Sequence, residues 1–286
     1  MLDSSNSETF PAISELCEIA AHRKRPLVFW IGAGTSRWAG LPSWADFTAN
    51  LHKEFVRKEP SYDRATASGA LEKQDFPSVF GLCQRSSRQR YNKFMLEALT
   101  SGTPTAIYKR FIDAITRIEP ASLITTNTDE LLEQRIAAHV VMSSDFEIVP
   151  QFLAEKKSFI AKLHGSVSQI DSLTFTDAEY ANLLSEKSLI NALTRVFEIS
   201  TVVFIGYGLR DDYVLKQLNT ASDLAQLFGT GPHFACRSTT GVSLPPSVRT
   251  IKYIAEPHRD HRTVIQVIEE LGPALEGHGT SVFCSW

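Results

Sequence analysis

Cysteine is scarce in this sequence, and its four cysteines lie too far apart to form any C-x-x-C pair. A zinc ribbon needs two such pairs, so a structural zinc site of that kind is excluded. Disulfide bonds are not expected either, because the polar and acidic N-terminus is unlike a secretory signal. We therefore expect a cytoplasmic protein that holds no metal.

Long apolar runs and an excess of positive charge are also missing. No run of about 18 apolar residues occurs, so no transmembrane helix is expected. The 29 Lys and Arg residues are outnumbered by 32 Asp and Glu residues, and the net charge of −3 argues against non-specific binding of nucleic acid. The 286 residues are 43% hydrophobic and 21% charged, which is typical of a globular protein with one large domain or two modest ones.

Apolar strand-like segments alternate with helical patterns along most of the chain. Leu27–Ile31 shows no polar alternation, as expected for a strand that is buried on both faces. The alternation predicts an α/β fold with a Rossmann-like, doubly wound parallel sheet. Residues 60–118 lack β-branched runs and predict an inserted helical module. The predicted strands are 27–31, 122–126, 139–142, 159–163, 201–205, 233–236 and 250–254, and the other predicted helices are 11–24, 43–58, 129–139, 176–200 and 258–271.

Polar or glycine-rich segments follow four of these strands, at residues 32–36, 127–129, 164–166 and 206–212. Ligands of doubly wound sheets bind outside the carboxyl ends of the strands. These four segments are therefore predicted to converge on one crevice.

Glycine-rich turns follow the first strand and the strand at 201–205. In Gly32-Ala33-Gly34-Thr35-Ser36 the glycines let the backbone approach a ligand, and amides and the Ser36 hydroxyl can bind phosphate. A tight strand-to-helix turn explains the same residues equally well. No lysine stands at the P-loop position, which excludes a P-loop nucleotidase. Gly206-Tyr207-Gly208 is either a second nucleotide contact or a plain turn.

Three polar side chains at the predicted crevice are candidates for catalysis. Asn127 and Asp129 directly follow a strand, where they can orient a ribose or a water molecule, although an Asx turn or a helix cap is also common there. His164 precedes a glycine that leaves room for a ligand, and a histidine can accept a proton near neutral pH. Histidines are more often merely packed or exposed, but the position of His164 favours a function.

Five short motifs occur in the order and rough spacing of the sirtuin (SIR2) family, and their details resemble its bacterial SIR2-like branch. The resemblance covers roughly residues 20–272. It implies one NAD-binding catalytic domain within residues 1–272, followed by a tail at 273–286. The motifs are Gly32-Ala-Gly-Thr-Ser36, Gly40-Leu-Pro-Ser43, Thr125-Thr-Asn-Thr-Asp129, Leu163-His-Gly165 and Phe204-Ile-Gly-Tyr-Gly208.

The resemblance implies a role for each predicted site residue. The family binds NAD and breaks its nicotinamide–ribose bond. By analogy, the loop of Gly32, Ala33, Gly34, Thr35 and Ser36 would hold the pyrophosphate, and Gly206, Tyr207 and Gly208 would lie near the adenosine half. Asn127 and Asp129 would serve the nicotinamide–ribose pocket, and His164 would be the catalytic histidine.

Two departures from the family pattern argue against protein deacylation. Deacylase sirtuins carry Gln where this chain has Thr126, and they usually carry a zinc ribbon that this chain cannot build. We therefore predict an NAD glycohydrolase that releases nicotinamide and ADP-ribose in a bacterial anti-phage (abortive infection) system. The alternatives are an NAD-dependent protein deacylase and a non-catalytic module that binds NAD or ADP-ribose.

Regulation is expected because an unregulated NAD hydrolase would kill its host. Nearly the whole chain is assigned to the catalytic domain, so we predict activation by a partner subunit or by homo-oligomer assembly. Partners in the SIR2-like branch include ATPases, short Argonautes and nucleotide-binding proteins. The apolar tail with Val282, Phe283 and Trp286 either contributes to such an interface or packs back on its own domain.

Overall fold

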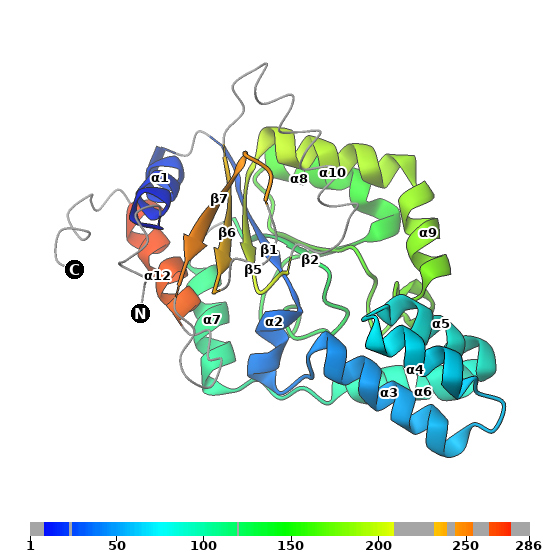
Figure 1. The fold of residues 1–286 in the computed structure, drawn as a ribbon. Coiled ribbons are helices and arrows are strands. Elements are labelled where there is room, and N and C mark those ends of the chain that lie inside the picture. The colour runs from blue at the N-terminus through cyan, green and yellow to red at the C-terminus, as the bar shows by residue number, and fades with distance from the viewer. Residues whose placement is uncertain are drawn as a thin grey trace.

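A seven-stranded parallel sheet forms the centre of the protein (Figure 1). The computed structural model describes residues 9–22, 25–118, 120–208, 232–238, 244–253 and 263–275. The strand order is β3-β4-β2-β1-β5-β6-β7, and every pair of neighbouring strands is parallel. The strands are β1 Leu27–Ile31, β2 Ser122–Thr125, β3 His139–Met142, β4 Phe159–Lys162, β5 Thr201–Ile205, β6 His233–Arg237 and β7 Val248–Lys252.

Strand β1 is the point at which the order of strand addition reverses. After β1 the chain builds β2, β3 and β4 on one side, and it then crosses to β5 on the other side. Helices cover both faces of the sheet, so the prediction of a Rossmann-like, doubly wound α/β fold is confirmed. The carboxyl ends of β1, β2, β4 and β5 lie at one edge, as the sequence analysis assumed.

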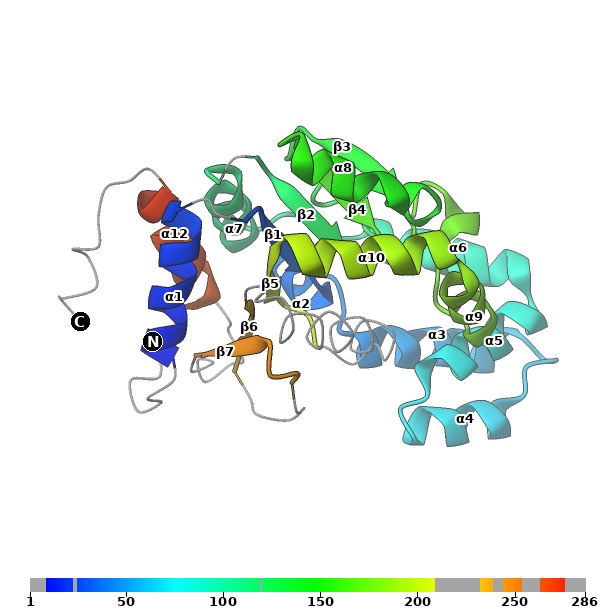
Figure 2. The same ribbon diagram turned by 90° about the horizontal axis from the view of Figure 1, so that it is seen from above.

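Alternate residues of β1 enter two different cores. Phe29 and Ile31 pack in the cluster that includes residues of α1, α7 and α12, whereas Val28 and Trp30 pack in the cluster of η2, α8 and α10. Figure 2 shows α1 and α12 on one side of the sheet and α10 on the other. The helices are α1 Thr9–His22, α7 Ala106–Thr116, α12 Thr263–Leu275, α8 Val149–Ala154 and α10 Lys187–Ile199, with the 3-10 helix η2 Ser143–Ile148.

A third hydrophobic cluster holds four helices together beside the sheet (Figure 1). Ser43 caps the first of them by accepting the Asp46 amide at 3.2 Å, as its spacing to Asp46 predicts. Helix α7 lies within the predicted module range 60–118 but packs on the sheet, so that range spans helices of two cores. The four helices are α3 Trp44–Lys58, α4 Arg64–Glu72, α5 Phe76–Ser86 and α6 Arg88–Thr100.

Two helical predictions differ from the structure. Residues 129–135 form turns, so the helix predicted over 129–139 is wrong. The long helix predicted over 176–200 is divided at Glu186 into α9, Asp177–Ser185, and α10. The predicted crevice segment 206–212 ends in Asp211 and Asp212, which lie outside the described residues, as does the tail beyond Leu275. Within the described ranges, no helix combines the length and the apolar character needed to cross a membrane.

Candidate functional site

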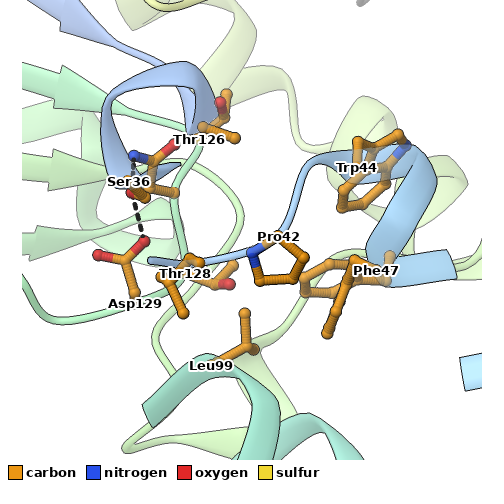
Figure 3. A pocket seen from close by; sticks show the side chains of 12 residues that line it. Ser36, Pro42, Trp44, Phe47, Leu99, Thr126, Thr128 and Asp129 are labelled. Carbon is orange, nitrogen blue, oxygen red and sulfur yellow. Dashed lines mark hydrogen bonds between the residues drawn. The ribbon is translucent and has the colours of Figure 1, made fainter. Parts of the chain in front are cut away.

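A cavity opens at the carboxyl ends of β1 and β2 (Figure 3). Its polar wall comes from the loops that follow these two strands, and its apolar wall comes largely from the helical cluster. Figure 3 shows Ser36 and Asp129 on one side of the cavity and Trp44 and Phe47 on the other. The lining residues are Ala33, Ser36, Thr126, Asn127, Thr128 and Asp129 on the strand side, and Leu41, Pro42, Trp44, Phe47, Leu99 and Phe175 opposite.

A buried hydrogen-bond chain joins the two loops of the polar wall. The Asn127 side-chain nitrogen donates to the Ser36 hydroxyl oxygen at 2.9 Å and to the Gly32 carbonyl at 3.2 Å. The Ser36 hydroxyl in turn donates to the Asp129 carboxylate at 2.8 Å. The Asn127 side-chain oxygen is buried and has no hydrogen-bond partner among the described residues. An unpartnered buried acceptor in a residue that lines the cavity is a candidate to bind a ligand donor.

Thr125 explains why Asn127 sits where it does. The Thr125 hydroxyl donates to the Ile31 carbonyl at the end of β1, at 2.7 Å, and accepts the Asn127 backbone amide at 2.9 Å. A β-branched residue at the end of a strand thus also forms the turn that follows it. The Asn127 side chain is thereby held over the first turn of the helix after β1, α2 Ala33–Ser36.

Burial dominates the electrostatics of Asp129, whose residue is 6% exposed. Desolvation raises the pKa of its carboxyl group, while the hydrogen bond from Ser36 and the charge of Lys162 oppose that rise. The Leu131 amide also donates to this carboxylate, at 3.1 Å. A carboxylate that accepts two hydrogen bonds beside a buried cation can stay ionised in spite of its burial.

Stacked aromatic rings form the apolar wall. The Trp44 ring lies 5.1 Å from the Phe175 ring, with 21° between their planes, and 5.3 Å from the Phe80 ring. Phe175 belongs to the segment after β4, which is tied back by the bond from the Thr174 amide to the His164 carbonyl at 3.1 Å. An aromatic wall that faces hydrogen-bonding groups suits a ligand with a flat ring and a polar sugar.

The sequence of residues 121–241 matches the family model of the SIR2-like domain. A curated relative, "Defense-associated sirtuin 2" of Bacillus subtilis, is 25% identical over 227 residues. The match covers 77% of this chain but only 21% of the relative, so the chain spans about a fifth of the relative's length. A solved structure of Sir2 enzymes covers 93% of this chain, and this chain covers 98% of it, with 13% identity and a TM-score of 0.45.

The glycine loop packs tightly against the carboxyl end of β5. The Gly32 amide donates to Ile205 and the Gly34 amide to Gly206, each at 2.9 Å. A Cβ atom at Gly32 would lie 2.5 Å from the Gly206 carbonyl oxygen, and Gly206 itself has a φ of +63°. The tight-turn explanation therefore accounts for these glycines, and their contact with a phosphate stays a prediction. Ala33, in contrast, is exposed and lines the cavity.

His164 lies one strand away from the Asn127 chain. It is 5% exposed, its ring centroid lies 5.2 Å from that of Tyr180 in an edge-on arrangement, and it is not among the residues that line the cavity. Its loop is nevertheless joined to the β2 loop, because the Val167 amide donates to the Thr128 carbonyl at 2.8 Å. The fold thus brings Ser36, Asn127 and Asp129 together and places His164 in the next loop.

The remaining predicted binding residues lie on the β5 side of the glycine loop. The Tyr207 ring packs 5.5 Å from Trp30 and 6.0 Å from Phe204. Gly208 is exposed, and Thr35 is buried with its hydroxyl donating to the Gly32 carbonyl at 3.0 Å. None of these three residues lines the cavity, so their contact with a ligand stays a prediction. In the described ranges no group of three His, Cys, Asp or Glu side chains is placed to hold a metal ion.

The aromatic wall and one buried cation were not predicted from the sequence. Trp44 and Phe47 stand three positions apart at the start of a helix, a spacing that predicts a shared face but not the cavity that this face lines. Lys162 has an exposed fraction of 0%. Its signal in the sequence is a charged residue inside the apolar segment 159–163, since a lysine is rarely buried without a partner.

Proposed function

We propose that this protein is an NAD glycohydrolase that cleaves the bond between nicotinamide and ribose. The observation that carries the proposal is the buried Asn127 oxygen, which has no partner among the described residues and belongs to a cavity with one polar and one aromatic wall. A ribose hydroxyl or a water molecule can donate to that oxygen, and the nicotinamide ring fits the aromatic side. The SIR2-like sequence supports the choice of NAD among ligands of this shape.

The reaction consumes one water molecule and yields nicotinamide, ADP-ribose and a proton. The C–N bond to the ribose breaks, and nicotinamide leaves as a neutral molecule because its ring is cationic in NAD. Positive charge then develops on the ribose, as in other glycoside cleavages. In this proposal Asn127 orients the ribose or the attacking water, the ionised Asp129 carboxylate favours that charge, and His164, from the next loop, accepts the proton from the water.

The defence context of the proposal comes from the curated relative, whose name is "Defense-associated sirtuin 2". We propose that this chain likewise acts in anti-phage defence, where loss of NAD halts infection. We also propose that its activity is switched on by a partner protein or by self-assembly, because constant cleavage would deplete the host of NAD.

The test is release of nicotinamide from NAD by the purified protein, alone and with candidate partner proteins. We expect release that falls by about 10²-fold or more in Asn127→Ala and His164→Ala. Full activity in both variants would contradict the assignment. An acyl-lysine peptide added to the same assay separates the alternatives, since only a deacylase would form acyl-ADP-ribose. Tight binding of NAD without turnover in any assembly would indicate a binding module instead.

A further inference from the structure

Lys162 is the most deeply buried charge in the neighbourhood of the site. It ends β4 in register with Thr125 of β2, and its side chain is inaccessible to solvent. Its ammonium group donates to the Asp129 carbonyl oxygen at 2.6 Å and forms an ion pair with Glu133. An α-helix would have directed that carbonyl to the Glu133 amide. The contact with Lys162 therefore accompanies the turns at 129–135, where a helix was expected.

Lys162 supplies one positive charge near two buried carboxyl groups, those of Asp129 and Glu133. The ammonium group pairs directly with the Glu133 carboxylate, and its charge also acts on the Asp129 carboxylate. The second carboxylate oxygen of Glu133 is buried without a partner in the described part of the chain. Desolvation raises the pKa of both carboxyl groups, and the Lys162 charge lowers both. The buried Tyr108 phenol of α7 also faces these two carboxylates, whose charges raise its pKa further. Without Lys162, two carboxyl groups would share a site that contains no balancing ammonium group, which favours their protonation.

The ionisation of Asp129 decides the direction of the hydrogen-bond chain. An ionised carboxylate only accepts, so the Ser36 hydroxyl must donate to it and can accept the Asn127 amide hydrogen. A protonated Asp129 can donate to Ser36 instead, which frees the Ser36 hydroxyl hydrogen to turn toward Asn127. The Asn127 amide would then lose one of the two acceptors that hold its nitrogen away from the ligand side.

We propose that Lys162 is a positioning residue, which orients the Asn127 carbonyl oxygen toward the ligand through Asp129 and Ser36. Lys162 itself touches neither NAD nor the reacting atoms. The activity readout of this inference rests on the proposed function, but the orientation of the Asn127 amide can be measured without NAD.

The test compares Lys162→Met with the double variant Lys162→Met/Glu133→Gln. The single variant leaves a buried carboxylate and can fail to fold, whereas the double variant removes both members of the ion pair. Lys157→Met is the matched control, because Lys157 is half exposed and pairs with Glu155 at the surface. In the folded double variant we expect nicotinamide release to fall about 10²-fold. We also expect the acid limb of the pH profile to move upward by about one unit or more.

Hydrogen exchange of the Asn127 side-chain amide supplies a readout that is independent of catalysis. In ¹⁵N-labelled protein without NAD, both amide hydrogens are expected to be protected in the wild type and in Lys157→Met. We expect at least one of them to exchange faster in the double variant. A double variant with a protected amide, wild-type kcat and an unmoved pH profile would overturn the positioning role. Absence of NAD cleavage by the wild type would instead overturn the proposed function, and the exchange rates would still decide the role of Lys162.

Discussion

The loop after β1 meets its two neighbours in different ways. Toward β5 the loop is held by backbone hydrogen bonds from the amides of Gly32 and Gly34, and the packing leaves no space for a Cβ atom at either glycine. Toward β2 the contact is made by side chains, through Ser36, Asn127 and Asp129, and a cavity lies beside it.

The β5 side of the loop is the more rigid one, and the β2 side holds the groups that can bind a ligand or exchange a proton. Backbone-to-backbone packing has few ways to rearrange, because both partners are held in strands or tight turns. Side chains that end in hydroxyl, amide and carboxyl groups can exchange protons and accept a ligand. We therefore expect substitutions on the β5 side to change stability first, and substitutions on the β2 side to change activity first.

The largest expected effect is on the β5 side, in Gly32→Ala. The added Cβ atom would meet the Gly206 carbonyl oxygen and the Tyr207 Cα atom, both at 2.5 Å, and neither is the end of a flexible side chain. We expect the free energy of unfolding to fall by about 3 kcal/mol, as measured by urea denaturation. Gly69→Ala in α4 is the matched control, because its Cβ would meet open space. This variant should be unchanged or more stable by about 0.5–1 kcal/mol. Equal stability of the two variants would refute the close contact.

The next effect is on the β2 side, in Ser36→Ala. The loss of the hydroxyl group breaks the chain between Asn127 and Asp129, so we expect nicotinamide release to fall about 10²-fold. The free energy of unfolding should fall by only about 1–2 kcal/mol. Ser200→Ala is the control, since Ser200 is also fully buried and its hydroxyl makes one bond, to Val196 at 2.6 Å. Ser200→Ala should lose similar stability but keep its activity, and a matching loss of activity in both variants would remove the special role of Ser36.

The smallest expected effect is on the pH dependence of stability, through His233 at the start of β6. His233 is buried and accepts the Val202 amide at 3.1 Å, and burial lowers its pKa to about 3. Between about pH 3 and 6.5 the unfolded chain binds the proton and the folded chain does not, so stability rises with pH across that window. The wild type should lose about 2 kcal/mol between pH 6.5 and pH 4, and His233→Asn should lose less.

An exposed histidine, His139, supplies the control for this pH dependence. We expect His139→Asn, a substitution at the surface, to change the free energy of unfolding by no more than about 0.5 kcal/mol. Asp129 on the β2 side acts with the opposite sign, because its raised pKa makes the folded state bind the proton more tightly than the unfolded chain does. A His233→Asn curve that coincides with the wild-type curve would show that acid lability does not come from the β5 side.

The central strands β1 and β5 were predictable because each is an apolar run without polar alternation. Leu27–Ile31 and Thr201–Ile205 are found at the predicted bounds, and β4 ends one residue before its predicted end. The helix predicted over 129–139 is replaced by turns, in which the Asp129 carbonyl accepts a hydrogen bond from Lys162, 33 positions away in the sequence. Periodicity reports only local spacing and contains no information about such a partner.

The candidate site was partly predictable for the same reason. Ser36, Asn127 and Asp129 follow the two neighbouring strands β1 and β2, so a parallel sheet brings them to one edge without further information. Trp44 and Phe175 could not be assigned to the cavity, because they arrive there from separate segments through the packing of the third cluster.

From the sequence alone we could predict the parallel sheet, the edge at which the polar segments gather and the helix start at Ser43. These features depend on apolar runs, strand ends and capping, which act over a few residues. Three features depend on the tertiary structure: the close packing of the glycines against β5, the Asn127 oxygen that is unpaired among the described residues, and the Lys162 charge that acts on two buried carboxyl groups. Each of these depends on atoms from distant segments meeting in a water-free interior, where an unpaired polar group or an extra methyl group costs free energy that no local pattern records.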